Sequence, residues 1–328
     1  MPERFPLDRL TRRVVRYFQR RSESYGLRRE MVNAHYILNW GGFVNASFTV
    51  TDGEKAYHLK LADDEDVLTG LKRWQALNGL LEERYHAPLM LDWIRLRGTG
   101  FEGPLFQYVP GHPADLVAQA GLLREVLDLL ERLHGDEELA GTLAEDSTPT
   151  CAEYFLGLYI DRFDEDLLIV APDLPPFVSL PLLDWMMGET RELEGLVREE
   201  AAFQLPAGAP IHGDLWSSNI LVTEDGQWVV IDWDDLALGD PALEYGILLG
   251  PLWREGGYTP DDLARLLPPD PALRERFRVC LRAFLLDEVI DPLADWVESG
   301  FAPEHQVLVR AEKERKHKAA LALYRDLF

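Results

Sequence analysis

The spacing of apolar and polar positions divides the first third of the chain into helices and strands. Apolar residues recur at helical intervals over residues 6–22, and arginines occupy most of the other positions. Residues 35–61 change to the alternation typical of strands, with a hairpin turn at Asp52-Gly53. Helical spacing returns over residues 64–83, and the segments MLDWIRL and GPLFQYV predict two more strands. The pattern therefore predicts an antiparallel β lobe.

The run Pro110-Gly111-His112-Pro113 ends this sheet pattern, and the rest of the chain is mainly helical. Periodic apolar positions predict helices over residues 116–134, 151–170 and 181–203, and again from residue 261 onward. One β-type island interrupts them at residues 209–235. We therefore predict an α+β fold with a basic helical extension at residues 1–30, a β lobe at 31–109, and a helical lobe at 110–328 that contains the β-hairpin at 209–235.

Composition is that of an ordinary globular protein, since 47% of the residues are hydrophobic and 27% are charged. No stretch approaches the roughly 20 consecutive apolar residues that a membrane span needs, and the first residues lack the apolar core of a secretory signal. Cys151 and Cys280 have no partner at metal-ligand spacing, which predicts buried thiols in a reducing compartment. We expect the cytoplasm as the location.

The net charge of −24 is distributed unevenly. Residues 1–30 contain nine arginines against four acidic residues, a net charge of +5, so the remaining residues carry −29. Such acidity repels nucleic acids and anionic membranes, and neither is expected as a partner. Two interpretations of the excess acid stay open. It keeps the protein in solution, or part of it lines a pocket for a cationic small molecule.

The segment from Pro210 to Asp235 contains most of the candidate chemistry. Its apolar runs predict two short strands joined by a turn at residues 224–227. Pairing these strands brings Asn219, just before the first strand, close to Asp232, just after the second. Asp214 lies five residues before Asn219, on the loop that enters the hairpin. We therefore expect three oxygen-bearing side chains at one end of the hairpin.

Carboxylate and amide oxygens are the ligands that Mg²⁺ accepts, and Mg²⁺ is usually bound together with phosphates. A carboxylate that is free of metal can accept a proton from an attacking hydroxyl group. His212 has no His, Cys or Glu at a metal-binding interval and is expected to form a hydrogen bond within its loop. Asp225 is expected to be a turn residue only.

The motif H-G-D-x-x-x-x-N from His212 to Asn219, followed by I-D-W from Ile231, resembles the catalytic and metal-binding motifs of the aminoglycoside phosphotransferase/choline kinase-like family. These enzymes are small-molecule relatives of the protein kinases. The resemblance covers roughly residues 35–320 and is strongest at 211–245. It implies a bilobal protein-kinase-like fold, with a nucleotide-binding β lobe and ATP and Mg²⁺ as cofactors. The activity it implies is transfer of the γ-phosphate to a hydroxyl of an amino sugar, aminoglycoside, sugar or amino alcohol.

The resemblance also implies a role for each matching residue. Asp214 would be the catalytic base, and Asn219 and Asp232 would hold Mg²⁺. Lys60, which strand alternation places on the face opposite to Leu59 and Leu61, would contact the α- and β-phosphates. The remaining implied contacts are the turn at Gly41-Gly42 over the phosphates, the backbone of Gln107 and Val109 at the adenine edge, with Phe106 behind it, and Trp216 beside the acceptor.

One feature departs from the family pattern. The family pairs its strand lysine with a glutamate on the following helix, whereas Glu65, Glu82 and Glu83 lie at the two ends of that predicted helix. The partner of Lys60 is therefore left open. Its absence would favour an alternative, a nucleotide-binding module without turnover. A Mg²⁺-dependent phosphohydrolase is a second alternative, against which Lys60 and the adenine-binding segment argue.

The acceptor is the least determined part of the prediction. The string HGDLWS is also similar to the fructosamine kinase branch of the family, although Asp232-Trp233 differs from that branch. Oligomeric state and the choice between ATP and GTP do not follow from the sequence. Acidic residues on the predicted helices either bind an amine or form a solvated face, and they are Asp161, Asp164, Glu165, Asp166 and Asp184.

Overall fold

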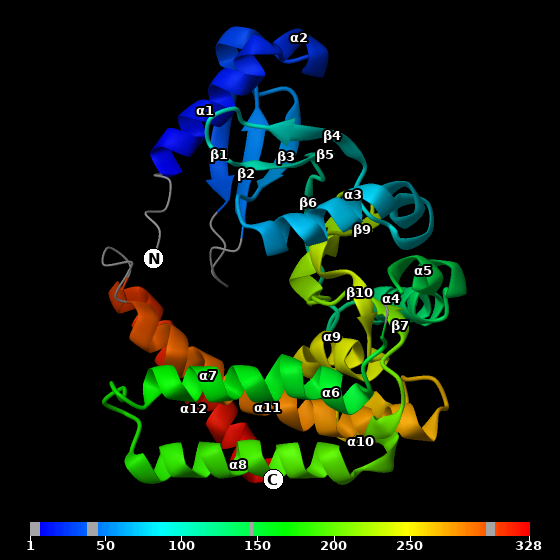
Figure 1. Cartoon of the computed structure of the whole chain (residues 1–328), viewed down its shortest axis with the longest axis vertical. Coiled ribbons are helices and arrows are strands. Elements are labelled where there is room, and N and C mark those ends of the chain that lie inside the picture. Colours follow the sequence, from blue (N-terminus) through cyan, green and yellow to red (C-terminus); the bar gives the residue numbers. More distant parts are fainter. Residues whose placement is uncertain (1–6, 38–44, 145–146, 300–305) are drawn as a thin grey trace. The chain divides into compact units, whose positions relative to one another are not determined.

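The computed structural model describes residues 7–37, 45–144, 147–299 and 306–328, and the chain divides into two compact units (Figure 1). The first unit comprises Met1–Ala114 with Ser217–Leu236, and the second comprises Asp115–Trp216 with Ala237–Phe328. A five-stranded antiparallel sheet dominates the first unit, and helices dominate the second. The predicted α+β class is confirmed.

The first unit contains most of the strands. In chain order its elements are α1 (Leu7–Arg20), α2 (Ser22–Tyr25), the 3-10 turn η1 (Arg29–Met31), β1 (Asn33–Ile37), β2 (Ala46–Thr51), β3 (Ala56–Leu61), α3 (Glu65–Tyr85), β4 (Met90–Arg95), β5 (Glu102–Gln107), β6 (Gly111–Pro113), η4 (Ser217–Asn219), β8 (Ile220–Thr223), β9 (Trp228–Val230) and η5 (Trp233–Asp235).

The main sheet has the strand order β1-β2-β3-β5-β4, and every pairing in it is antiparallel. The turn between β2 and β3 is fixed by Asp52, whose carboxylate accepts hydrogen bonds from the backbone N–H groups of Glu54 and Lys55. Gly53 has φ +89°, a conformation that favours glycine. Strands β2 and β3 pair on the two sides of this turn, with Ser47 opposite Lys60. The predicted hairpin at Asp52-Gly53 is therefore confirmed.

One face of this sheet is covered by α1. Leu10, Val14 and Phe18 recur at helical spacing and are buried in a core with Phe48, Val50, Leu59 and Leu61 of the neighbouring strands. The helix predicted at residues 6–22 therefore forms, and its apolar stripe is part of the core of the first unit. Its arginines face outward because the opposite side of an amphipathic helix remains in solvent.

The other face of the sheet is covered by α3. The side chain of Asp64 caps this helix by accepting hydrogen bonds from the N–H groups of Asp66 and Val67. Trp74 of α3 packs on Phe106 of β5, with a distance of 4.3 Å between ring centroids. Lys60 lies on this face with its Nζ 5.7 Å from the Trp74 ring, so the alternation predicted for β3 is confirmed.

The hairpin β8–β9 groups with the first unit, whereas the sequence predicted it as part of the helical lobe. Four contacts explain the difference. The ring of His86, at the end of α3, stacks on Trp228 at a centroid distance of 4.1 Å. Val230 N–H donates to the carbonyl of His86. Ala114 N–H donates to the carbonyl of Ile220, and β6 pairs with β8, so the segment at 111–113 is a strand.

The second unit is mainly helical. Its elements are α4 (Ala120–His134), α5 (Glu137–Leu143), α6 (Cys151–Phe155), the π-helical segment η2 (Leu156–Ile160), α7 (Asp161–Val170), α8 (Leu180–Glu199), η3 (Ala201–Gln204), β7 (Ala209–Ile211), β10 (Ala237–Gly239), α9 (Pro241–Gly256), α10 (Pro260–Ala264), α11 (Pro271–Glu298) and α12 (Gln306–Leu327).

The core of the second unit is built around α11, which contacts α7, α9 and α12 (Figure 1). Cys151 and Cys280 are both buried and form no disulfide, as predicted. Within the described parts of the chain, no helix combines the length and the apolar character needed to cross a membrane.

The packing of α1 leads to a stability prediction. Phe18 is fully buried, and a large-to-small change in such a place leaves a cavity. We expect Phe18→Ala to lower the free energy of unfolding by about 3–5 kcal/mol. Arg12→Ala, an exposed position on the same helix, should leave it nearly unchanged. Chemical denaturation of the two variants measures both values. Equal stabilities would contradict the placement of α1 in the core.

Candidate functional site

Lys60 is the centre of the site in the first unit. Its side chain is almost fully buried, and its Nζ lies 2.8 Å from Oδ1 of Asp232 and 2.7 Å from Oδ1 of Asp234. Both carboxylates come from the turn that follows β9, while Lys60 comes from the middle of the main sheet. The ion pair therefore joins the hairpin to the sheet.

The two carboxylates determine the charge state of this lysine. Burial alone would disfavour the ammonium form, but the charges of Asp232 and Asp234 outweigh it and raise the pKa of Lys60 above its ordinary value. Nearby His58 has the opposite shift, because burial and the charge of Lys60 lower its pKa to about 4. The site thus holds one fixed positive charge and one neutral imidazole.

The question of the lysine's partner is answered by Asp234. Glu65, Glu82 and Glu83 are all exposed, and none forms an ion pair with Lys60 among the described residues. In the second turn of α3 the chain has Gly70, where a Cβ atom would lie 2.2 Å from the carbonyl oxygen of Asp234. Because Gly70 has no side chain, the turn after β9 can lie close to α3. The carboxylate of Asp234 in that turn then reaches Lys60.

A second contact fixes the same turn. Arg73, one helical turn after Gly70, donates from Nη1 to the carbonyl of Leu236 at 2.8 Å. Sequence reasoning missed Asp234, Gly70 and Arg73 as site residues. The acidic run Asp232–Asp235 was the available signal, but nothing local showed which of its members faces the lysine.

Asn219 and Asp232 lie at the same end of the β8–β9 hairpin, as predicted. Ile220 pairs with Val230, and one position further Ile231 N–H donates to the carbonyl of Asn219 at 2.9 Å. Asp232 then adopts a left-handed conformation with φ +67°. Such a conformation is costly for a residue other than glycine and is concentrated at functional sites.

The donor set at this end of the hairpin fits Mg²⁺. It offers one carboxylate that is partly exposed and one amide side chain. Mg²⁺ typically takes one or two carboxylates and completes its shell with water and phosphate oxygens. Among the described residues no cluster of three or more His, Cys, Asp or Glu side chains could hold a metal by itself. These two donors would leave the rest of a Mg²⁺ shell to water and phosphate oxygens.

Asp214 lies in the second unit, on the loop after β7, and the backbone of this loop is fixed by Glu244 of α9. The Glu244 carboxylate is buried and accepts hydrogen bonds from the N–H groups of His212 (2.6 Å) and Gly213 (3.1 Å). Its other oxygen lies 2.7 Å from Nε2 of His134. The expectation for His212 is confirmed, because its Nδ1 accepts a 3.3 Å hydrogen bond from Asp214 N–H. These contacts hold the backbone on both sides of Gly213.

Glu244 was not found from the sequence, although a signal exists. It is an isolated acid in the apolar stretch from Ala242 to Leu249 at the start of α9. An acid in such a place is buried and needs hydrogen-bond donors. The preceding Asp240 is also buried, where it caps α9 and pairs with Arg276 through contacts of 2.8 and 3.1 Å. The start of α9 is therefore fixed from two sides.

The remaining residues that the resemblance implied as ligand contacts are Gln107, Val109, Gly41, Gly42 and Trp216. Gln107 ends β5, and its N–H already has a partner, since it donates to the carbonyl of Leu89. Val109 is half-buried beyond it. Gly41 and Gly42 lie outside the described residues. In the second unit Trp216 is half-buried and packs on Phe284 at a centroid distance of 5.7 Å.

Acidic side chains of α7 and α11 form a cluster in the second unit. Burial, and next the charge of Asp291, raise the pKa of Asp166 to about 7. Burial likewise raises the pKa of Asp287 to about 7, although Arg162 forms an ion pair with it. The pKa of Asp291 is raised by burial and by the charge of Asp295. Of the acids that the sequence singled out on these helices, Asp166 belongs to this cluster, whereas Asp164 binds Arg191.

Comparisons with known proteins were made on sequence and on structure. The sequence profile of the phosphotransferase enzyme family (APH) matches residues 35–278. No curated protein sequence matches the chain.

Solved structures with the same fold cover nearly the whole chain. A choline kinase from Cryptosporidium parvum Iowa II is 14% identical and has a TM-score of 0.62, with 96% of this chain and 95% of that chain covered. The GDP complex of aminoglycoside 2'-phosphotransferase-IIIa is 15% identical with a TM-score of 0.63, covering 97% and 99%. The choline kinase LicA from Streptococcus pneumoniae is 11% identical with a TM-score of 0.52, covering 94% and 98%.

The lysine cluster generates a stability prediction. Asp234→Ala removes one of two carboxylates from a buried ammonium group, and we expect the free energy of unfolding to fall by about 1.5–3 kcal/mol. Gly70→Ala should also destabilise the first unit, because the new methyl group displaces the carbonyl of Asp234. Glu82→Ala and Glu83→Ala are the matched controls on α3 and should have little effect. Denaturation curves measure these stabilities. A loss of stability in a glutamate variant but not in Asp234→Ala would contradict this pairing.

The acidic cluster predicts a pH dependence. The folded protein holds a proton on Asp166 up to about pH 7, whereas the unfolded chain releases it near the ordinary value of about 4. The stability due to this proton is therefore present at low pH and is lost as the pH rises through 7. We expect the melting temperature to fall between about pH 5.5 and about pH 8, and Asp166→Asn to reduce that fall. Glu165→Gln, on the same helix, is the control; an identical pH profile for both variants would contradict the prediction.

Proposed function

This chain belongs to the phosphotransferase enzyme family, and on that premise we propose that it transfers the γ-phosphate of ATP to a hydroxyl group of a small, amine-bearing molecule. Phosphoryl transfer requires little covalent chemistry from a protein; it needs cations on the phosphates and a correctly placed acceptor. The observation that carries the proposal is the buried Lys60, held between Asp232 and Asp234 beside the hairpin end that carries Asn219.

Lys60 and Asp232 would divide the phosphate and metal roles between them. Lys60 is a fixed positive charge for the α- and β-phosphates, and Asp232 with Asn219 would hold Mg²⁺. When bound, Mg²⁺ neutralises charge on the phosphate oxygens. Lys60 and Asp232 neutralise each other, so the buried ammonium group is not left unpaired. Asp234 would keep Lys60 paired after Asp232 takes up the metal.

Asp214 would be the general base. The hydroxyl oxygen of the acceptor attacks the γ-phosphorus, the bond from that phosphorus to the bridging oxygen breaks, and ADP leaves. The proton of the hydroxyl group passes to the Asp214 carboxylate. The hydrogen bonds of Glu244 to the N–H groups of His212 and Gly213 support this role, because they fix the backbone of the loop that carries Asp214. A base that is positioned in advance contributes more to the rate than a mobile one.

The acceptor is proposed to carry a positive charge. Asp166, Asp287 and Asp291 are grouped with Arg162, and burial raises the pKa of each of the three acids. An amine that enters beside them would favour their ionised forms. Solved structures with this fold include proteins named as choline kinase and aminoglycoside phosphotransferase, whose named acceptors are amines with hydroxyl groups. Trp216 would then flank the acceptor.

The two alternatives have less support. A nucleotide-binding module without turnover was suggested by the missing glutamate, and Asp234 now occupies the place of that partner. A phosphohydrolase would not need the lysine cluster. The donor nucleotide is proposed as ATP, but the GDP complex of a protein with this fold makes GTP the necessary comparison.

The deciding experiment is Mg²⁺-dependent release of nucleoside diphosphate from ATP or GTP. The acceptor pools would be aminoglycosides, sugars with glycated amines, and amino alcohols. We expect one amine-containing pool to stimulate release. Asp214→Asn should lower turnover about 100-fold or more and keep nucleotide binding, whereas Asp232→Ala should also weaken Mg²⁺-nucleotide binding about tenfold or more.

Asp225→Asn is the matched control for both variants, since Asp225 is an exposed turn residue of the same hairpin, hydrogen-bonded to Thr223. Normal turnover by Asp214→Asn would show that the base is another residue. Silence with every pool, although nucleotide binds, would favour the module without turnover.

A further inference from the structure

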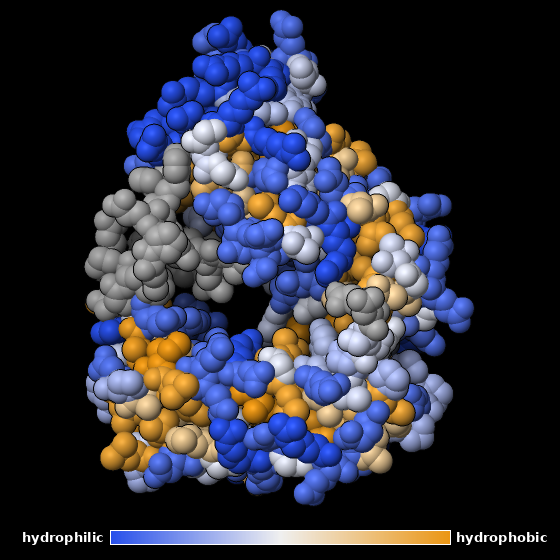
Figure 2. Space-filling model, viewed as in Figure 1, coloured by the Kyte–Doolittle hydropathy of each residue, from blue (hydrophilic) through white to orange (hydrophobic). Residues whose placement is uncertain are grey.

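A second charged feature lies on the outer side of α1. Six arginines line a pocket of about 550 Å³ that α1 forms with the end of β4 and the turn after it. The surface over α1 is continuously hydrophilic (Figure 2). The residues around the pocket are Arg13, Arg16, Arg20, Arg21, Arg95 and Arg97, together with Tyr17 and Leu96.

Most of this positive charge is not neutralised by the protein. Arg95 binds Glu102, with 2.6 Å between Nε and Oε2. Within the described ranges of the chain, no carboxylate forms an ion pair with any of the other five arginines. Guanidinium groups gathered in one hollow repel each other, and an anion that binds among them relieves this repulsion. The protein as a whole carries a charge of −24, so this pocket is a local exception.

The arginines are held in place by the fold. Leu10, Val14 and Phe18 anchor the inner side of α1 in the core, which fixes the direction of its outer side. Arg16 donates from Nε to the carbonyl of Arg12 at 3.2 Å. Arg21 lies over the ring of Tyr17, 4.1 Å from its centroid. The pocket is therefore partly organised before any ligand binds.

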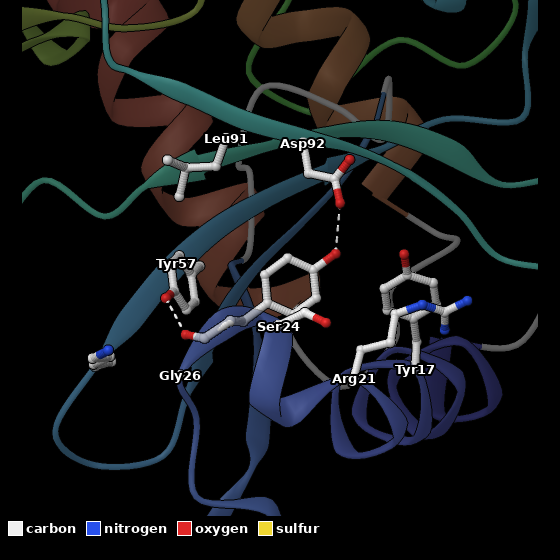
Figure 3. Close-up of a pocket in the computed structure, with 9 residues that line it drawn as sticks. Tyr17, Arg21, Ser24, Gly26, Tyr57, Leu91 and Asp92 are labelled. Atoms are coloured by element: carbon white, nitrogen blue, oxygen red, sulfur yellow. Dashed lines mark hydrogen bonds between the residues drawn. The ribbon is translucent and has the colours of Figure 1, made fainter.

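An aromatic pocket of about 670 Å³ adjoins the arginines and shares Tyr17 and Arg21 with them (Figure 3). Two of its three tyrosine hydroxyls already have partners. Tyr25 donates to Asp92 at 2.7 Å, and Tyr57 donates to the carbonyl of Tyr25 at 2.5 Å. These two tyrosines therefore offer a ligand their rings rather than their hydroxyl groups.

We propose that the arginine pocket binds a compact small molecule that carries a chain of several phosphates, either an inorganic polyphosphate or a nucleoside polyphosphate. Guanidinium groups bind phosphate oxygens in pairs, and several of them match a chain of phosphates better than a single anion. The hollow has the size of a small-molecule site. In a nucleoside polyphosphate, the base would lie against the rings of the adjoining aromatic pocket.

Two macromolecular ligands fit less well. An extended nucleic acid would leave the pocket and meet a chain whose residues 31–328 carry a net charge of −29, whereas a compact anion responds to charges within the screening length of about 8 Å. An anionic membrane would attract the arginines, but the apolar side of α1 is buried in the core and cannot enter a bilayer.

This site is separate from the lysine cluster. α1 packs on the sheet face that carries Leu59 and Leu61, and Lys60 points to the opposite face beside Trp74. The inference therefore does not rest on the proposed kinase activity, and either one can fail without the other.

The test is calorimetric titration of the full chain with inorganic tripolyphosphate in the absence of Mg²⁺. We expect one binding site and an affinity that falls about tenfold or more between low and high salt. The double charge reversal Arg16→Glu with Arg20→Glu should weaken binding at least tenfold. The matched control, Arg124→Glu with Arg315→Glu, changes the net charge equally at two exposed positions outside the pocket and should keep binding within about twofold.

A Lys60→Met variant tests independence from the lysine cluster and should bind tripolyphosphate like the wild type. Melting curves of all variants exclude unfolding as the cause of a loss. Guanosine 5'-tetraphosphate distinguishes the two kinds of ligand. Tighter binding than that of tripolyphosphate, with the difference lost in Tyr17→Leu, indicates a nucleoside polyphosphate. Equal binding of the two compounds indicates an inorganic polyphosphate. Unchanged binding in the Arg16/Arg20 variant overturns the site. An equal loss of tripolyphosphate binding in the control or in Lys60→Met also overturns it. So does a protein that binds single-stranded DNA or phosphatidylglycerol vesicles but does not bind tripolyphosphate.

Discussion

The ion pair of Lys60 with Asp232 and Asp234 is the interaction on which the first unit's site depends. A buried ammonium group is stable only with carboxylates beside it, and both of its carboxylates come from one turn. That turn must therefore lie on the sheet. Its approach requires the missing side chain at Gly70 and the left-handed backbone at Asp232. The positions of α3, the sheet and the β8–β9 hairpin relative to one another thus all depend on the buried charge of Lys60.

The second unit uses the reverse arrangement, a buried carboxylate surrounded by donors. Glu244 binds two successive backbone N–H groups of the loop before Asp214 and also contacts His134. A loop with few side-chain contacts would otherwise sample many conformations, and ordering it for catalysis would cost conformational entropy. The buried charge of Glu244 here fixes the backbone of the loop on which Asp214 lies.

The central sheet separates two electrostatic environments. On the α3 side one lysine is fully neutralised by acids, and on the α1 side five arginines have no acidic partner among the described residues. The apolar core formed by Phe18, Phe48 and Leu59 lies between α1 and the sheet. A compact anion on the arginines and a nucleotide at Lys60 would therefore meet separate surfaces of the same unit. The roles of Lys60 as a phosphate contact and of Asp214 as the base remain predictions.

The sequence by itself determined the facing of residues within a strand and the pairing of strands joined by a short turn. Alternation placed Lys60 opposite to Leu59, and the turn between β8 and β9 brought Asn219 to the end of the hairpin where Asp232 lies. Only the tertiary structure decided the pairings across long separations. Lys60 and Asp234 are 174 residues apart, His134 and Glu244 110, and Arg162 and Asp287 125. Periodicity describes which face a residue takes within its own helix or strand. Which charges meet is decided by the packing of elements against each other, because a buried charge accepts only the partner that this packing brings within reach.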